Sequence, residues 1–136
     1  MSQCVFCRIV AGEIPCTKVF EDETTLAFMD LGQVNPGHVL VAVKPHRETI
    51  LDLDEALAAD VFRTSWRIAR AAEKALHPGG FTLLQANRKA GLQTVPHFHI
   101  HVLPRHEGDG VTLAWPAKNP PFETLQRAAE TLKAAL

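Results

Sequence analysis

The fold of this chain is decided by the stretch Pro96-His97-Phe98-His99-Ile100-His101-Val102-Leu103-Pro104-Arg105. Its three histidines alternate with apolar residues, and a period of two predicts a half-buried strand with one polar and one apolar face. We expect the alternating apolar side chains to enter a core, while the histidines line the opposite face about 6.6 Å apart. The three imidazoles would then border one small site.

Imidazole changes its charge near neutral pH and can serve as a nucleophile or as a metal ligand. A single histidine on a strand is usually a surface or core residue, but this stretch places three in phase in a chain with seven histidines. Two chemistries fit the pattern: a metal site, or a phosphoryl- or nucleotidyl-transfer site in which one histidine is the nucleophile. Composition leaves both open.

The bulk composition indicates a single globular domain. The chain has 136 residues, of which 46% are hydrophobic and 21% charged, values that are ordinary for a globular protein. The net charge of −1 gives no basic field that would hold nucleic acid or an anionic membrane. We therefore expect neither partner, and an anionic substrate would need a few positioned donors. No apolar run approaches the roughly 18 residues that span a bilayer.

The three cysteines are an odd number, and two of them form the pair Cys4-x-x-Cys7. The start of the chain lacks the basic-then-apolar layout of a signal peptide. Both observations favour a reducing compartment, and we expect a cytoplasmic protein. The pair alone fits half of a zinc site, a redox pair or coincidence. Two histidines elsewhere would complete a tetrahedral site.

Period-two segments predict four further strands, over residues 19–21, 25–30, 38–43 and 81–86. Between the last two, a helical pattern predicts one long amphipathic helix with Asp52 as its N-cap, Glu55 at the third helical position, and an end at His77. A final helix follows residues 119–121, and we expect its apolar stripe to be packed. Strands in sequential antiparallel order with one long intervening helix predict an α+β domain.

Residues 97–103 match, at every position, the signature of the histidine triad family, His-x-His-x-His followed by two apolar residues. The similarity extends from Cys4 to about Asp109 and resembles the bacterial branch related to purine nucleoside phosphoramidases. Further matching segments are Cys4-Val5-Phe6-Cys7, Ile14-Pro15, Phe28-Met29-Asp30, Pro36-Gly37-His38, Lys44-Pro45-His46, and Asn87 followed by Gly91-Leu92-Gln93-Thr94.

This resemblance implies the histidine triad fold: a five-stranded antiparallel sheet that carries a helix and pairs into a two-fold homodimer. Residues 1–136 would form one such domain, with 110–136 as a C-terminal extension that contains a helix. We expect the dimer to pair through the strand that follows the long helix and through part of that helix. The apolar run Phe81-Thr82-Leu83-Leu84 would be hazardous as an exposed sheet edge.

The resemblance also implies a mechanism. His99 would attack the α-phosphorus of a purine nucleoside phosphoramidate or related phosphate conjugate, and water would release the nucleoside monophosphate from a nucleotidyl-histidine. His101 would donate a hydrogen bond to a phosphate oxygen, and His97 would help to orient or protonate the reacting groups. Nucleotidylyltransferase relatives carry glutamine at the third histidine, so His101 favours hydrolysis. Two alternatives stay open: a dinucleoside polyphosphate hydrolase, and a nucleotide-binding adaptor with negligible turnover.

The family pattern assigns the ligand contacts residue by residue. Asp30 would accept both ribose hydroxyls, and apolar residues would sandwich the base. Donors would hold the phosphate and the leaving-group oxygen. Arg88 and Lys89 stand in a loop that is about one residue shorter than in close relatives, and they bear on the leaving-group preference. The expected apolar residues are Phe6, Ile9 and Leu31, and the expected donors are Asn87, Gln93 and Thr94.

Some bacterial relatives hold a structural zinc with a ligand set that corresponds here to Cys4, Cys7, His46 and His97. Such a site is closed, so it would stabilise the N-terminal region and would not activate water. It would also remove His97 from proton transfer. The competing metal hypothesis is a catalytic ion on all three triad histidines.

Overall fold

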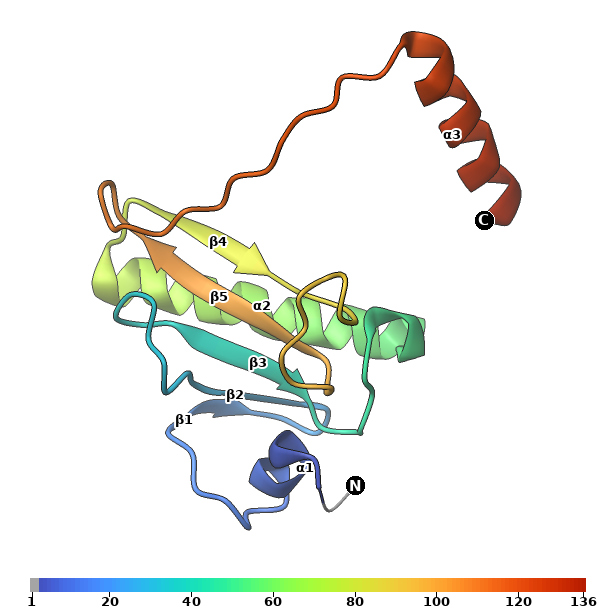
Figure 1. Cartoon of the computed structure of the whole chain (residues 1–136). Coiled ribbons are helices and arrows are strands. Elements are labelled where there is room, and N and C mark those ends of the chain that lie inside the picture. Colours follow the sequence, from blue (N-terminus) through green and yellow to red (C-terminus); the bar gives the residue numbers. More distant parts are fainter. Residues whose placement is uncertain (1–2) are drawn as a thin grey trace.

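The all-apolar segment Val39–Val43 forms β3, the central strand of a five-stranded antiparallel sheet (Figure 1). The computed structural model describes residues 3–136, and the strand order is β1-β2-β3-β5-β4. Every residue of β3 is buried because each face of this strand is covered. The other strands are β1 (Lys18–Glu21), β2 (Thr25–Met29), β4 (Gly80–Leu84) and β5 (His99–Arg105).

One face of the sheet is covered by the long helix α2 (Glu55–Leu76). Its buried positions recur at helical spacing and pack on the side chains of β3 and β5. Phe98, Ile100 and Val102 belong to this core, so the predicted direction of the apolar side chains in the histidine stretch is confirmed. The helix ends at His77, which takes the left-handed conformation with φ 49°.

The predicted N-cap of α2 is wrong by two residues. Asp54 caps the helix, and its carboxylate accepts the Leu57 amide at 2.8 Å. Asp52 is not available because its carboxylate accepts the Thr49 amide (2.8 Å) and hydroxyl (2.9 Å) in the cap of a short 3-10 helix, η1 (Ile50–Asp52). The polar residues before α2 therefore cap two successive helices.

The other face of the sheet carries α1 (Val5–Val10). Its Phe6 packs in a second cluster with the alternate residues of β2 and β3, and the Phe6 and Phe28 rings meet edge to face at 5.4 Å. The two core clusters thus lie on opposite sides of one sheet, which follows from the alternation of side chains along each strand. Within residues 3–136, no helix combines the length and the apolar character that crossing a bilayer requires.

The C-terminal segment departs from the body of the protein (Figure 1). After β5 the chain runs without a helix or strand to α3 (Phe122–Ala135), which stands apart from the sheet and from α2. The prediction that its apolar stripe is packed is wrong for the single chain, since no residue of α3 is buried. A helical apolar pattern indicates that a face needs cover but does not say which chain supplies it.

Candidate active site

The register of the sheet places two histidines of β5 on the face that α1 covers. His99 lies opposite Ala42 and His101 lies opposite Leu40, and directly opposed residues of an antiparallel pair share one face. The ring centroids of His99 and His101 are 5.0 Å apart. The Phe6 ring stands edge-on to His99, also at 5.0 Å. Phe6 therefore shields this face from solvent.

A cavity of about 310 Å³ opens beside these rings. Its wall is made of apolar side chains with a few polar groups, a composition typical of small-molecule sites. The fully exposed side chain of Leu31 lies on this wall. The predicted site residues on it are Phe6, Ile9, Asp30, Leu31, Thr94, His99 and His101; His97, Asn87 and Gln93 lie outside it.

A backbone contact determines which nitrogen of His99 carries the proton. Nδ1 lies 2.8 Å from the carbonyl oxygen of His97. A carbonyl only accepts, so Nδ1–H donates and Nε2 of the neutral ring keeps its lone pair. Burial lowers the pKa of His99, against the opposing effects of this hydrogen bond and of the Asp30 carboxylate. His99 is therefore a neutral imidazole with a nucleophilic Nε2 at neutral pH.

His101 is oriented by a second histidine, His38, at the start of β3. The Val34 amide donates to Nδ1 of His38 (3.2 Å), so the proton of the neutral His38 ring is on Nε2, which lies 2.9 Å from Nδ1 of His101. Nδ1 of His101 accepts a hydrogen bond from this N–H group. The proton of the neutral His101 ring is therefore on its Nε2. Burial, with smaller effects of His99 and His38, lowers the pKa of His101 to about 4. His101 thus offers the site a neutral N–H donor.

Asp30 follows β2 and links the cavity to this histidine pair. Its Oδ1 accepts the Gly32 amide at 2.8 Å, and its Oδ2 lies 3.3 Å from Nε2 of His38. A carboxylate offers about four lone-pair positions. Both oxygens therefore retain capacity to accept hydroxyl groups of a ligand.

His38 is the site residue to which the sequence assigned no role. It is buried, and burial lowers its pKa although Asp30 opposes the shift. The feature of the sequence that could have identified His38 is the family segment Pro36-Gly37-His38. A single histidine ahead of an apolar strand does not reveal a partner 63 residues away.

His97 does not line the cavity, so the expectation that all three imidazoles border one site is wrong for this residue. It is fully buried, and its Nε2 donates to the Val43 carbonyl at 2.6 Å. Its Nδ1 lies 3.3 Å from Sγ of Cys4 and 3.5 Å from Sγ of Cys7. Nδ1 of His46 lies 3.2 Å from Sγ of Cys7. The structure thus brings together the predicted cluster Cys4, Cys7, His46 and His97, whose donor atoms all lie within 4.8 Å of one another.

This donor set fits zinc. Zinc–sulfur and zinc–nitrogen bonds of about 2.3 and 2.0–2.1 Å imply sulfur–nitrogen separations of about 3.6 Å in a tetrahedral site, close to the 3.2–3.5 Å found here. The Val43 carbonyl holds the proton of His97 on Nε2, which leaves Nδ1 as the ligating nitrogen, in the arrangement typical of metal-bound histidines.

Asn87 and Gln93 make hydrogen bonds within the protein. Oδ1 of Asn87 accepts the Ile50 amide at 2.7 Å, which ties its loop to η1. Oε1 of Gln93 accepts the Arg88 amide (2.7 Å), and its Nε2 donates to the Glu48 carbonyl (2.6 Å). Both side chains therefore hold the loop that leads to Thr94.

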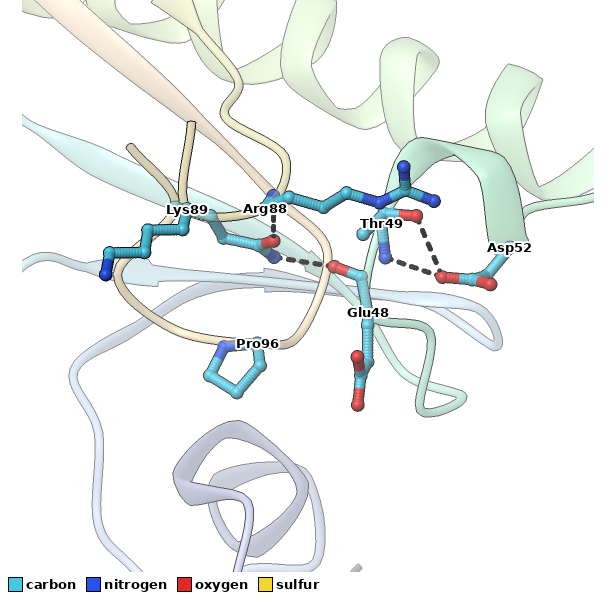
Figure 2. A pocket seen from close by; sticks show the side chains of 7 residues that line it. Glu48, Thr49, Asp52, Arg88, Lys89 and Pro96 are labelled. Carbon is cyan, nitrogen blue, oxygen red and sulfur yellow. Dashed lines mark hydrogen bonds between the residues drawn. The ribbon is translucent and has the colours of Figure 1, made fainter. Parts of the chain in front are cut away.

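Figure 2 shows a second, larger cavity of about 510 Å³, which is lined by residues of this loop and by residues 48–52 ahead of α2. The Arg88 side chain reaches toward Thr49 and Asp52, while Lys89 points away from them. The cavity wall carries Arg88 and Lys89 but also Glu48 and Asp52. The two signs of charge balance, so this cavity has no marked preference for an anion.

Comparison with known proteins follows the same motifs. The family model of the HIT domain matches residues 11–108. The chain belongs to the HIT domain family. Adenosine 5'-monophosphoramidase hnt1 of Schizosaccharomyces pombe is 35% identical over 115 residues, which cover 84% of this chain and 84% of that protein. The family expected from the histidine stretch is thus confirmed.

Solved structures of HIT proteins show the same fold. The crystal structure of a HIT family protein from Bacillus anthracis is 40% identical, with a TM-score of 0.93, and covers 98% of this chain and 97% of that chain. A zinc-bound histidine triad family protein from Mycobacterium smegmatis is 35% identical, with a TM-score of 0.76, and covers 99% of both chains. These matches confirm the predicted α+β fold of the HIT family.

Proposed function

We propose that this HIT protein is a nucleotidyl hydrolase that cleaves nucleoside phosphoramidates, or related nucleoside phosphate conjugates, through a nucleotidyl-histidine intermediate. The observation that carries the proposal is the fixed tautomer of His99, whose ring lines the cavity with Nε2 as the basic nitrogen. The similarity to the S. pombe adenosine 5'-monophosphoramidase supports this class of substrate. Three free cysteines agree with a reducing, cytoplasmic location.

The reaction proceeds by two displacements at one phosphorus. Nε2 of His99 attacks the α-phosphorus and forms a phosphorus–nitrogen bond, and the bond to the leaving amine breaks as the amine takes up a proton. Water then attacks the same phosphorus, loses a proton and breaks the bond to His99. Nucleoside monophosphate leaves and His99 returns to its neutral form. Two moderate barriers thereby replace one high barrier.

His101 and Thr94 supply hydrogen bonds to the phosphate. Nε2–H of His101 donates to a non-bridging oxygen, and its fixed orientation stabilises the charge that develops there. Thr94 lines the same cavity and adds a hydroxyl. His97 contributes through its carbonyl, which orients His99. Asn87 and Gln93 act by positioning the loop that carries Thr94.

The nucleoside occupies the cavity beside α1. Asp30 accepts the ribose hydroxyls, and Phe6, Ile9 and Leu31 flank a purine base. Burying a base against these apolar side chains supplies affinity, while the carboxylate fixes the sugar.

The cluster of Cys4, Cys7, His46 and His97 holds one structural zinc per chain. The donor set and its spacing support this assignment, as does the zinc-bound M. smegmatis relative. When bound, the ion ties α1 to the ends of β3 and β5.

A panel of substrates tests the proposed reaction. An adenosine phosphoramidate, a dinucleoside polyphosphate and an adenylyl conjugate are compared under one set of conditions. We expect the highest kcat/KM for the phosphoramidate. A preference for the dinucleotide would assign the protein to the polyphosphate hydrolases, and tight binding without turnover of any of the three would make it an adaptor.

Sugar selectivity tests the role of Asp30. A carboxylate that accepts two hydroxyls loses a partner when one is absent, at a cost of about 1–3 kcal/mol, or roughly 5- to 150-fold in kcat/KM. We expect this preference for an adenosine phosphoramidate over its 2′-deoxy analogue. Equal kcat/KM values for the two sugars would show that Asp30 does not contact the ribose.

His38 tests the orientation of His101. Replacing His38 with alanine removes the donor to Nδ1 of His101, and we expect kcat to fall about 10- to 100-fold with little change in KM, since a fixed donor acts on the developing charge. His38→Gln retains an N–H group near the position of Nε2 and should recover part of the loss. Equal kcat values for the two variants would contradict an orienting hydrogen bond.

The protein forms a homodimer by pairing through β4 and α2. β4 is an edge strand, and its residues Leu83 and Leu84 are exposed, as is Phe62 of α2. An unpaired apolar edge favours pairing with another copy. We expect light scattering at micromolar concentration to report about twice the 15.0 kDa of one chain. A single-chain mass would refute the pairing.

A further inference from the structure

Cys16 is the cysteine that the proposed zinc site does not use. Cys4 and Cys7 belong to the metal cluster, whereas Cys16 stands on the segment that joins α1 to β1 (Figure 1). It is a free cysteine, and its side chain is only partly buried. The surroundings of this thiol therefore determine what it can react with.

Cys16 lies on the wall of the cavity in which we place the nucleoside. Phe28 and Leu40 share this wall, and Cys16 packs against the apolar cluster to which both belong. The backbone beside Cys16 is held in place, because the Thr17 carbonyl accepts the Met29 amide at 2.9 Å. The structure thus fixes a free thiol on an apolar part of the cavity wall.

His99 indicates independently that this cavity takes up a ligand. Its side chain lines the same wall and is only 7% exposed. Its Nδ1 is bonded to the His97 carbonyl, and its Nε2 has no hydrogen-bond partner among residues 3–136. A buried polar atom without a partner costs free energy until a ligand or water contacts it. The cavity volume of about 310 Å³ is small for such a site, so two ligands would compete for the same space.

The position of the thiol favours one class of reagent. Cysteine is strongly nucleophilic, and its thiolate is the reacting form. Charged reagents lose hydration against an apolar wall, so a small uncharged electrophile enters this cavity more readily. Zinc engages the sulfur atoms of Cys4 and Cys7 in metal bonds when it is bound. Cys16 is then the thiol that remains available to such an electrophile.

We propose that Cys16 is a site of covalent modification by small uncharged α,β-unsaturated carbonyl compounds, and that the adduct excludes the nucleotide. The sulfur forms a bond to the β-carbon, and the electron pair of the carbon–carbon double bond moves to the α-carbon. The thiol releases a proton to water and the α-carbon takes one up, so the reaction is an addition without a leaving group or an oxidant. The inference rests on the proposed function for the identity of the ligand that is excluded.

Labelling of the zinc-loaded, full-length protein with N-ethylmaleimide tests the site. Peptide mapping by mass spectrometry should locate the first adduct on Cys16, and calorimetry should show that the labelled protein no longer binds adenosine monophosphate (AMP). If adduct and nucleotide exclude each other, the labelling rate falls by the factor 1 + [AMP]/Kd, or about 100-fold at about 100 times Kd. A first adduct on Cys4, Cys7 or His99, or a labelling rate that AMP does not change, would overturn the proposal.

A thiol moved to another surface provides the matched control. Cys16→Ala with Lys74→Cys places the thiol at an exposed position of α2, which covers the opposite face of the sheet. We expect this variant to be labelled at a rate that AMP does not change, and to bind AMP equally before and after labelling. Loss of AMP binding on labelling at position 74 would contradict exclusion within the cavity. Phosphoramidate turnover reports separately on the hydrolase: a protein that binds AMP and protects Cys16 but has no turnover would refute the proposed function and support this inference.

Discussion

Replacing His99 with alanine lowers kcat for an adenosine phosphoramidate by at least about four orders of magnitude, because the covalent route is lost with its nucleophile. The remaining groups still bind and polarise the substrate. We therefore expect the dissociation constant of adenosine monophosphate to stay within about threefold of the wild-type value. Turnover by rapid quench and binding by calorimetry separate the two effects.

The intermediate can be observed directly. Quenching the wild-type protein within the first turnover should trap a nucleotidyl group on Nε2 of His99, the nitrogen that the His97 carbonyl leaves without a proton. His99→Gly with added imidazole is the matched control, since free imidazole can occupy the vacated space and restore part of the turnover. Wild-type rates in the alanine variant, or no phosphorus–nitrogen adduct at His99, would exclude covalent catalysis at this residue.

The alternation of the histidine stretch was sufficient to predict the orientation of β5. Phe98, Ile100 and Val102 must avoid water, and only one face of the strand meets α2. The same alternation could not predict where the ring of His97 points. β5 begins at His99, and the ring of His97 is fixed by the Val43 carbonyl.

Hydrogen-bond partners were the part of the site that the sequence could not supply. Asn87 and Gln93 stand where the family pattern expects phosphate donors, but the donors of both side chains have partners within the protein. Nδ2 of Asn87 donates to the Gln85 side chain, and Nε2 of Gln93 donates to the Glu48 carbonyl. His38 was missed because its partners, Val34 and His101, come together only through the sheet. Direct contact of Asn87 and Gln93 with a substrate stays a prediction. A pattern of residue types predicts a face; the partner of each polar atom depends on tertiary structure.

The C-terminal helix illustrates a related limit. Its stripe is a correct indication of an apolar face, and its helix forms as predicted over Phe122–Ala135. Periodicity carries no information about which chain provides the complementary surface.

Removing zinc from the cluster of Cys4, Cys7, His46 and His97 should destabilise the protein strongly and leave the chemistry nearly intact. A closed site has no open position for a reactive water, so its ion acts on folding and not on the phosphorus. Metal binding that requires the folded ligand set contributes its binding free energy to stability. For a domain of this size we expect the melting temperature to fall by more than about 10 °C on chelation. On protein that is still folded, kcat should change less than about threefold.

The cysteines provide a matched comparison for this prediction. Cys7→Ser removes a ligand that lies within 3.5 Å of two histidine nitrogens. Cys16→Ser makes the same chemical change at a cysteine outside the cluster. We expect the first variant to lose stoichiometric zinc by elemental analysis and to melt early, and the second to keep both its metal and its melting temperature. The alternative of a catalytic ion requires the opposite pattern, in which gentle chelation stops turnover while the protein stays folded. That result would move the metal from Cys4 and Cys7 to the histidines of the cavity.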